Sequence, residues 1–252
     1  MQHLTNIHMS ININNMIPKV IHYCWFGRNP LPPLALKCIE SWKKFLPDYE
    51  IKEWNEDNFD VNMIPYTKEA YEAKKYAFVS DYARFWILYH YGGLYFDTDV
   101  EVIRNMDDII ARGPFMGCEG EASDTSVASV APGLSFYKEM LELYSTLHFI
   151  NPDGTYNQKT IVAYTTEMLC NYGLKNTNEM QECAGMWIYP KDYFCPKDYY
   201  TGKLLLTENS MSIHHYDASW KSKSSELKKR IAVLIGPMLT SWIVSIKSML
   251  KR

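Results

Sequence analysis

The chain has 252 residues, which is enough for one large hydrophobic core and possible short appendages. Its formal net charge of −3 argues against a general nucleic-acid-binding protein, so no nucleic-acid partner is expected. Six cysteines without a C-x-x-C pair fit a reduced, cytosolic chain. Residues 1–16 lack the basic and apolar regions of a signal peptide, and we expect them to form a flexible leader.

The chain opens with a β-α-β pattern. Lys19–Gly27 is rich in β-branched and aromatic residues and ends at a glycine, which predicts the first strand. Residues 31–47 begin with prolines and carry apolar residues at helical spacing, which predicts a helix. Residues 49–55 alternate like a second strand. This order favours an α/β layered domain with parallel strands.

A long helix is predicted over residues 68–91, and from Tyr76 onward it is apolar on almost every side, as is typical of a buried helix. Within it, Asp81 and Arg84 lie three residues apart on one face. Two interpretations stay open for them. They could neutralise each other as a buried ion pair, or they could offer a carboxylate for hydroxyl groups and a guanidinium for phosphate oxygens.

The pair Gly92-Gly93 then introduces a strand-like run, "LYFDTDVEVI", which contains Asp97 and Asp99. Residues i and i+2 of a strand point to the same face, so both carboxylates are expected to aim at one spot. Like charges held that close repel each other unless a cation joins them. We therefore expect the pair at the carboxyl end of a central strand, binding a divalent metal that also binds a diphosphate.

The second half of the chain predicts further elements in the order of an α/β domain. They are a strand over 114–120, helices over 135–147 and 159–173, and a loop-rich aromatic segment over 186–220. A late polar and aromatic cluster could complete a metal or diphosphate site, although spacing alone cannot bring it to Asp99. Its members are His214, His215, Asp217, Ser219 and Trp220.

Residues 221–252 differ from the rest in composition. A basic cluster precedes about sixteen mostly apolar residues, which Gly236-Pro237 interrupts, and the end is basic again. The apolar run is shorter than the roughly twenty residues that span a bilayer. We expect an amphipathic helical tail on an anionic membrane surface, with the protein peripheral on the cytoplasmic inner face of the cell membrane. The alternative is a terminal helix that packs on the catalytic domain.

Four stretches together resemble glycosyltransferase family 32, the DXD-containing group with initiating-mannosyltransferase-like and capsular polysaccharide synthesis members. They are "IPKVIHYCWFG", "SDYARFWILYHYGGLYFDTDV", "IYPKDYFCP" and "SIHHYDASW". The second stretch is also similar to the catalytic domains of large clostridial glucosylating toxins. The resemblance implies a GT-A domain over residues 17–220, with a Rossmann-like central sheet and flanking helices. It also implies Mn²⁺ or Mg²⁺ as cofactor, a UDP- or GDP-hexose donor, retention of anomeric configuration, and a glycan or lipid-linked glycan acceptor in surface polysaccharide biosynthesis.

The resemblance assigns roles to the central residues. Asp81 and Arg84 match the pair that holds the donor sugar, with Arg84 also near the diphosphate. Tyr95 and Asp97 match positions that contact the ribose and sugar region. Asp99 matches the direct metal ligand, and these four charged residues form the expected catalytic set.

Four further residues match more peripheral positions of the family. Trp25 matches the aromatic residue that stacks on the donor's nucleobase. His215, Ser219 and Trp220 fall where related enzymes bring a late loop over the metal and the diphosphate. The resemblance thus implies donor binding by Trp25, Tyr95, Ser219 and Trp220, and metal binding by Asp99, Asp97 and His215.

Two rival functions remain at the level of sequence. In a haloacid-dehalogenase-like phosphatase, Asp97 would be the nucleophile and Asp99 the acid/base, but Glu101 stands where that pattern has Thr or Val. The second rival is a non-catalytic carbohydrate-binding scaffold. Charges clustered in an apolar setting count against it, because a decayed site has no chemical reason to keep them.

Overall fold

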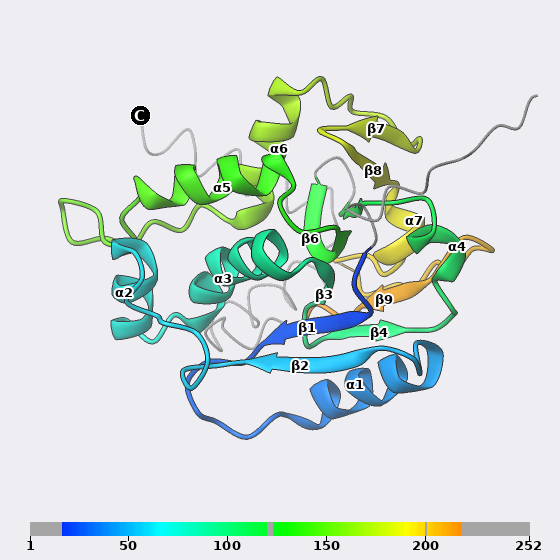
Figure 1. Ribbon diagram of the computed structural model, residues 1–252, viewed down its shortest axis with the longest axis horizontal. Coiled ribbons are helices and arrows are strands. Elements are labelled where there is room, and N and C mark those ends of the chain that lie inside the picture. Colours follow the sequence, from blue (N-terminus) through cyan, green and yellow to red (C-terminus); the bar gives the residue numbers. More distant parts are fainter. Residues whose placement is uncertain (1–16, 120–122, 200, 218–252) are drawn as a thin grey trace, which may run out of the picture.

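The computed structural model describes residues 17–119, 123–199 and 201–217, and side-chain burial is not described for residues 120–127 (Figure 1). The expected leader, the expected tail, Ser219 and Trp220 therefore lie outside the described residues. Among the described residues, no helix combines the length and the apolar character that crossing a membrane requires.

The described chain forms a mixed seven-stranded sheet in the order β2-β1-β3-β6-β5-β8-β7 and a two-stranded sheet of β4 and β9. The strands are β1 (Val20–Cys24), β2 (Glu50–Trp54), β3 (Gly93–Phe96), β4 (Val100–Val102), β5 (Phe115–Cys118), β6 (Ser123–Val130), β7 (Gln181–Cys183), β8 (Met186–Tyr189) and β9 (Ser212–His214). β1 pairs in parallel with both β2 and β3, whereas β3 and β6 are antiparallel. The predicted α/β class and the parallel opening unit are confirmed.

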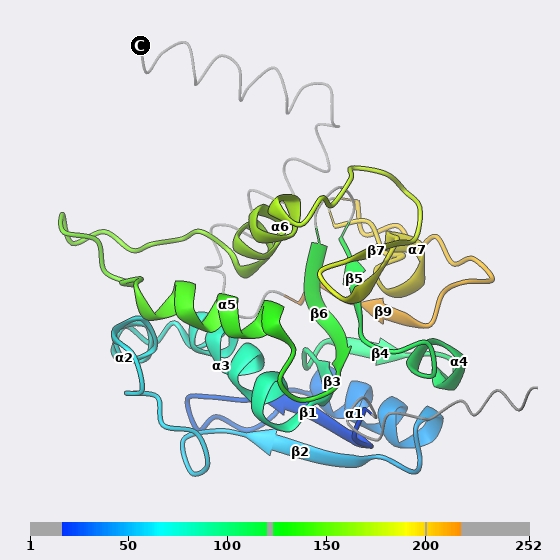
Figure 2. The same ribbon diagram turned by 45° about the horizontal axis from the view of Figure 1, so that its top comes forward.

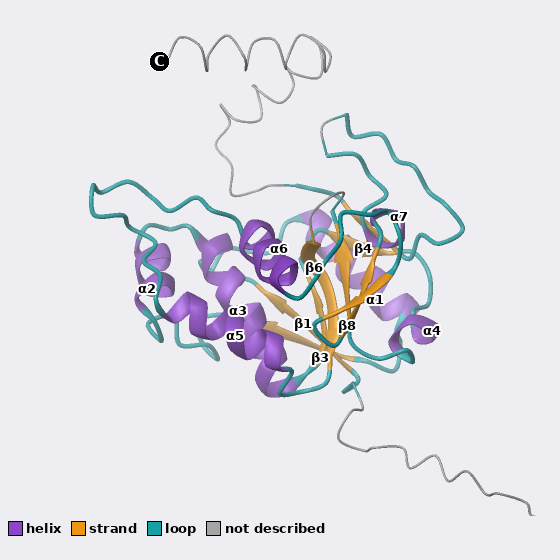
Figure 3. Ribbon diagram, turned by 90° about the horizontal axis from the view of Figure 1, so that it is seen from above, coloured by secondary structure: helices purple, strands orange, loops and turns teal. Residues whose placement is uncertain are grey.

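Helices cover both faces of the large sheet. They are α1 (Pro33–Phe45), α2 (Pro65–Glu72), α3 (Tyr76–Tyr91), α4 (Asp107–Ile110), α5 (Ser135–Ser145), α6 (Ile161–Asn171) and α7 (Lys191–Phe194). Figure 3 shows α2, α3, α5 and α6 on one side of the strands and α1, α4 and α7 on the other. Figure 2 shows β9 beside β4, its antiparallel partner.

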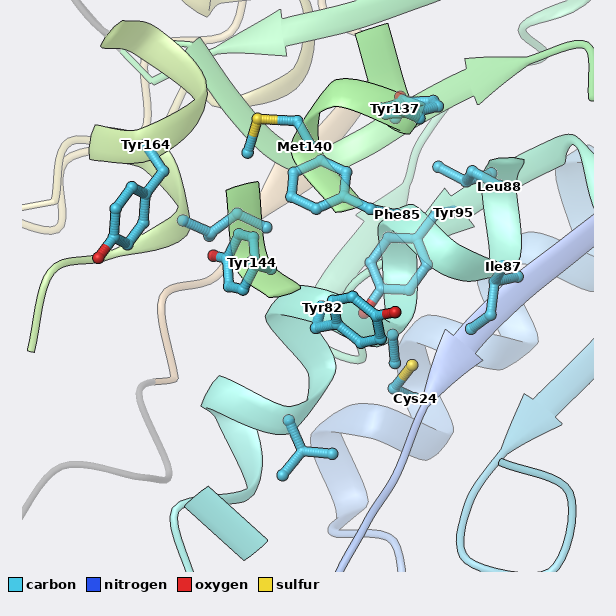
Figure 4. Close-up of a cluster of buried hydrophobic side chains, with 14 of the residues drawn as sticks. Cys24, Tyr82, Phe85, Ile87, Leu88, Tyr95, Tyr137, Met140, Tyr144 and Tyr164 are labelled. Atoms are coloured by element: carbon cyan, nitrogen blue, oxygen red, sulfur yellow. The ribbon is translucent and has the colours of Figure 1, made fainter. Parts of the chain in front are cut away.

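Each face of the sheet has its own hydrophobic cluster, and aromatic residues fill much of both. In the cluster shown in Figure 4, Phe85 of α3 lies 5.5 Å from Tyr137 and 6.0 Å from Tyr144 of α5, measured between ring centroids. β3 serves both cores, because Tyr95 joins the α3 side while Leu94 and Phe96 join the other. Most of the chain's aromatic content is therefore core packing.

The prediction of one continuous helix over residues 68–91 is wrong. The chain forms α2 and α3 instead, because Lys74 between them adopts a left-handed conformation with φ of 56°. The amide of Lys74 closes the end of α2 on the carbonyl of Tyr71 at 2.9 Å. No glycine or proline marks this break in the sequence, and it turns Lys74 and Tyr76 toward the pocket described below.

The run "LYFDTDVEVI" is not one strand. β3 ends at Phe96, residues 97–99 form a turn, and β4 continues in the two-stranded sheet. The amide of Val100 closes this turn on the carbonyl of Asp97 at 3.0 Å. Same-face alternation therefore relates Tyr95 to Asp97, and Asp99 is placed by the turn rather than by the strand.

The Gly92-Gly93 pair reverses the chain between α3 and β3, with φ angles of 63° and 93°. His22 of β1 fixes this reversal, since its Nε2 lies 3.0 Å from the carbonyl oxygen of Gly92 and its Nδ1 accepts the indole N–H of Trp54 at 3.1 Å. Nε2 must then carry the proton. Burial lowers the pKa of His22 to about 4, so the ring is neutral at pH 7.

We expect Gly93→Ala to destabilise the protein far more than Gly113→Ala. Both glycines have positive φ, 93° and 108°, but a Cβ at Gly93 would lie 2.6 Å from the carbonyl oxygen of Val20, whereas nothing lies within 4 Å at Gly113. The strain of positive φ costs about 1 kcal/mol in either variant, and the clash adds about 1–3 kcal/mol at Gly93. Urea unfolding of the two variants measures this difference, and equal losses of unfolding free energy would contradict it.

Candidate active site

A pocket of about 850 Å³ lies at the carboxyl ends of the parallel strands β1 and β3. Trp25 directly follows β1 and Asp97 directly follows β3, and both line it. α3 contributes Asp81 and Arg84 to the same wall. This is the usual position of a binding site in an open α/β sheet, and the volume is that of a ligand pocket.

Arg84 and Asp97 form a bidentate ion pair in the wall of the pocket. The guanidinium Nη1 donates to Oδ2 of Asp97 at 3.2 Å, and Nη2 lies 3.0 Å from Oδ1. The hydroxyl of Tyr95 donates to the same Oδ1 at 3.0 Å, and the guanidinium carbon lies 4.7 Å from the centre of the Tyr95 ring. Three groups from α3 and β3 thus fix one another, which favours a rigid site.

Asp81 is the weaker partner of Arg84, because its Oδ1 lies 3.6 Å from Nη2. Burial alone would lower the pKa of Arg84, but the carboxylates of Asp97 and Asp81 outweigh it and raise that pKa well above its usual value. The interpretation in which Asp81 and Arg84 simply neutralise each other is therefore incomplete, because Arg84 also pairs with Asp97. Arg84 bridges two carboxylates that both line the pocket.

Asp99 contacts the last described segment of the chain, residues 214–217. Its Oδ1 lies 3.3 Å from Nε2 of His214, and its Oδ2 accepts the amide N–H of Asp217 at 2.9 Å. Burial raises the pKa of Asp99, but the nearby His214 and the amide of Asp217 outweigh burial and lower it to about 2. Asp99 is therefore ionised at pH 7.

The imidazole of His215 does not reach Asp99. Its Nε2 lies 2.8 Å from Oε2 of Glu101, the same oxygen to which Lys37 donates at 2.7 Å. Only the backbone of His215 bonds to Asp99, through an N–H that donates to the Asp99 carbonyl at 2.9 Å. In the described structure it is His214 that occupies the position expected of His215.

Trp25 and several unexpected residues complete the pocket wall. The indole N–H of Trp25 donates to the carbonyl of Asn29 at 2.6 Å, which fixes the ring while leaving it at the pocket. Sequence reasoning assigned no role to several other lining residues. Among them are Lys74, Thr160, Lys191, Asp198 and Tyr199. They come from loops and helix ends, and only Lys191 lies inside a stretch, "IYPKDYFCP", that the family resemblance had marked.

The donor set of the pocket fits a divalent cation that is shared with a ligand. Within 17–119, 123–199 and 201–217, no group of three or more His, Cys, Asp or Glu side chains is arranged to hold a metal ion by itself. Mg²⁺ and similar hard cations, however, are commonly held by one or two carboxylates together with substrate phosphates. The ionised, partly buried carboxylate of Asp99 meets that requirement.

The fold and the site define an α/β protein with a polar pocket at the switch from parallel to antiparallel strands, next to a D-x-D turn. Residues 32–116 match the family described as "Glycosyltransferase sugar-binding region containing DXD motif". This region holds Asp81, Arg84, Asp97 and Asp99. The resemblance to DXD-containing glycosyltransferases is thereby confirmed, and the phosphatase alternative loses its support.

Individual relatives agree with the family match. The chain is 32% identical over 103 residues to inositol phosphoceramide mannosyltransferase 3 of Schizosaccharomyces pombe, covering 39% of this chain and 29% of that protein. It is 34% identical over 106 residues to the uncharacterized glycosyltransferase L373 of Acanthamoeba polyphaga mimivirus, covering 40% of this chain and 42% of that one. The chain thus matches less than half the length of these relatives.

Among solved structures, the glycosyltransferase PaToxG aligns with a TM-score of 0.49 at 18% sequence identity, over 62% of this chain and 69% of that one.

We expect Arg84→Lys to lower the free energy of unfolding by about 1–3 kcal/mol, because an ammonium cannot reproduce the planar fork that holds Asp97. The matched control is Arg28→Lys, whose guanidinium pairs with Asp57 at 2.6 Å but has a side chain 61% exposed. That variant should change stability by less than about 0.5 kcal/mol. Thermal and urea unfolding of both variants tests this prediction. An Arg84→Lys variant as stable as the unmodified protein would show that the buried ion pair does not stabilise the fold.

Proposed function

We propose that the chain is a metal-dependent, retaining hexosyltransferase. It moves a sugar from UDP- or GDP-hexose to a hydroxyl group of a glycan or lipid-linked glycan. One observation carries the proposal: Asp99 lines the same pocket as the Arg84–Asp97 pair, and all three residues lie within the region that matches DXD-containing glycosyltransferases.

The proposed donor lies with its base toward Trp25 and its sugar toward α3. Trp25 offers a ring whose orientation is fixed by Asn29, and stacking on a nucleobase needs such a ring. Asp81 and Asp97 offer carboxylate oxygens to the hydroxyl groups of the hexose. The Arg84 clamp keeps Asp97 from turning, so the sugar is oriented with its anomeric carbon toward the acceptor.

The leaving group is a nucleoside diphosphate, and stabilising its negative charge is the main catalytic task. Arg84 keeps its positive charge at any accessible pH, since its pKa is raised well above the usual value. Asp99, with His214 next to it, would hold Mn²⁺ or Mg²⁺. Such a cation neutralises charge on the departing diphosphate.

Retention of configuration follows from attack on the same face from which the diphosphate leaves, with a phosphate oxygen accepting the acceptor's proton. This scheme needs no enzyme nucleophile. It requires that Asp81 and Asp97 keep hold of the sugar while the bond to phosphate breaks, which suits side chains on a rigid helix and at a strand end.

The acceptor is proposed to be lipid-linked, in surface polysaccharide biosynthesis such as that of a capsule. The names of fungal relatives couple a mannosyl group with inositol phosphoceramide, which supports a mannosyl donor and an acceptor anchored in a membrane. We place the enzyme on the cytoplasmic inner face of the membrane, with residues 221–252 as the proposed anionic-membrane anchor and 17–220 as the catalytic domain.

A screen of nucleotide sugars, read by release of nucleoside diphosphate with Mn²⁺ or Mg²⁺ present, tests the function. We expect slow hydrolysis of one UDP- or GDP-hexose even without acceptor, because water can replace the acceptor hydroxyl. Metal-dependent binding of a nucleotide sugar by calorimetry without any release would instead favour the non-catalytic scaffold. Release of phosphate from simple phosphomonoesters would restore the phosphatase.

We expect Asp99→Asn to lower metal-dependent release at least about a hundredfold while the protein stays folded, because the change removes one charge and almost no volume. Asp48→Asn is the control, since Asp48 is exposed and forms a surface ion pair with Lys19 at 3.4 Å. Activity is measured at limiting Mn²⁺, and circular dichroism checks that each variant is folded. Activity equal to the unmodified protein at low Mn²⁺ would remove Asp99 from the metal site.

A further inference from the structure

An exposed leucine hairpin stands next to the pocket. We use this name for residues 196–206, of which residue 200 is not described. The amide of Leu205 donates to the carbonyl of Pro196 at 3.0 Å, and the amide of Asp198 donates to the carbonyl of Lys203 at 2.8 Å. Because its backbone bonds close internally, the hairpin holds a defined shape. The loop between α7 and β9 that contains it projects from the layered body (Figure 3).

Three consecutive leucines lie on the second arm of this hairpin, across from Pro196 and Lys197, and face solvent. Leu204, Leu205 and Leu206 are 44%, 54% and 53% exposed. Every other large hydrophobic residue that is exposed in the described part of the chain stands alone in the sequence. Single exposed apolar residues are ordinary, whereas a contiguous exposed run indicates a contact surface.

The first arm and the turn of the hairpin are attached to the site. Lys197 Nζ donates to the carbonyl of His215 at 2.9 Å, and the ring of Tyr199 packs edge-on against Tyr216 with 5.2 Å between centroids. Asp198 and Tyr199 line the pocket. Leu204 pairs with Lys197, so a surface that held the three leucines would lie beside the part of the pocket wall formed by Asp198 and Tyr199.

The described chain also ends at this place. Asp217 lines the pocket and holds Asp99 through its amide. The basic and apolar residues 221–252 therefore follow within a few residues of the hairpin's anchoring point. The described chain thus ends beside the pocket, and the sequence that follows is basic and apolar, which favours one extended apolar partner for the hairpin and this segment.

We propose that the leucine hairpin is a second membrane contact, which dips into a lipid bilayer beside the pocket. A glycan offers leucine side chains no apolar partner, whereas a bilayer accepts Leu204–Leu206 at its acyl boundary and the exposed Lys203 at its headgroups. Three leucines alone give only weak, reversible binding, so the hairpin acts together with the tail. This inference rests on the proposed function, in which the acceptor is lipid-linked. A hairpin held in the bilayer would bring that acceptor close to the pocket.

The test attaches a polarity-sensitive fluorophore to Leu205→Cys in the full-length chain with Cys170→Ser, because Cys170 is the exposed native thiol. Leu36→Cys on α1 is the matched control, since Leu36 is 51% exposed and Leu205 is 54% exposed. The parent chain without an added cysteine corrects for labelling elsewhere. Emission is recorded with vesicles of phosphatidylcholine and phosphatidylglycerol, and flotation reports total binding.

We expect a blue shift on adding vesicles for the label at Leu205 and none for the label at Leu36. Leu205→Ser combined with Leu206→Ser should reduce the floated fraction at limiting lipid about tenfold, while Leu36→Ser leaves it unchanged. Flotation without a shift at Leu205 would assign binding to the tail alone and overturn the proposal. A shift that depends on protein concentration and not on lipid would overturn it in favour of self-association. Neither readout uses activity, so failure here is separate from failure of the proposed transfer reaction.

Discussion

The need to neutralise one buried guanidinium organises the centre of this protein. Arg84 is 5% exposed, and an unpaired charge at that depth would cost several kcal/mol. Asp97 meets the need only if β3 ends level with the middle of α3. The Gly92-Gly93 reversal permits that arrangement, and His22 secures it from the neighbouring strand. The geometry of the pocket and the core packing thus depend on the same local contacts.

The same constraint separates the two aspartates of the D-x-D motif. Asp97 is bound by Arg84 and Tyr95, which suits the sugar-orienting role proposed for it, whereas Asp99 is held by a segment more than a hundred residues later in the chain. The turn after β3 makes this division, because it sends the chain from the large sheet to the small one. A single strand through both residues would have left two carboxylates competing for one cation.

The sequence was sufficient for the features that depend on local order. The opening β-α-β unit, the buried character of α3, and the position of Asp97 at a strand end follow from periodicity, burial patterns and the glycine pair. The break between α2 and α3 at Lys74 could not be predicted, because no glycine, proline or asparagine in the sequence marks the left-handed residue. The pairing of Arg84 with Asp97 depends on how α3 lies against β3, and spacing within the helix pointed only to Asp81.

The sequence also could not show whether His214 or His215 contacts Asp99. The register of β9 on β4 places His214 opposite Val100, and the imidazole of His215 pairs with Glu101. Strand alternation would not bring His214 to Asp99, and the turn over residues 97–99 does so by setting where the Asp99 side chain lies.

A crystal structure of the 252-residue chain with UDP or GDP and Mn²⁺, with the metal located by its anomalous signal, tests the proposed site most directly. We expect the manganese on the Asp99 carboxylate and the diphosphate, with Arg84 still paired with Asp97 and the base at Trp25. A nucleotide bound outside this pocket, or manganese bound without Asp99, would contradict the proposed site.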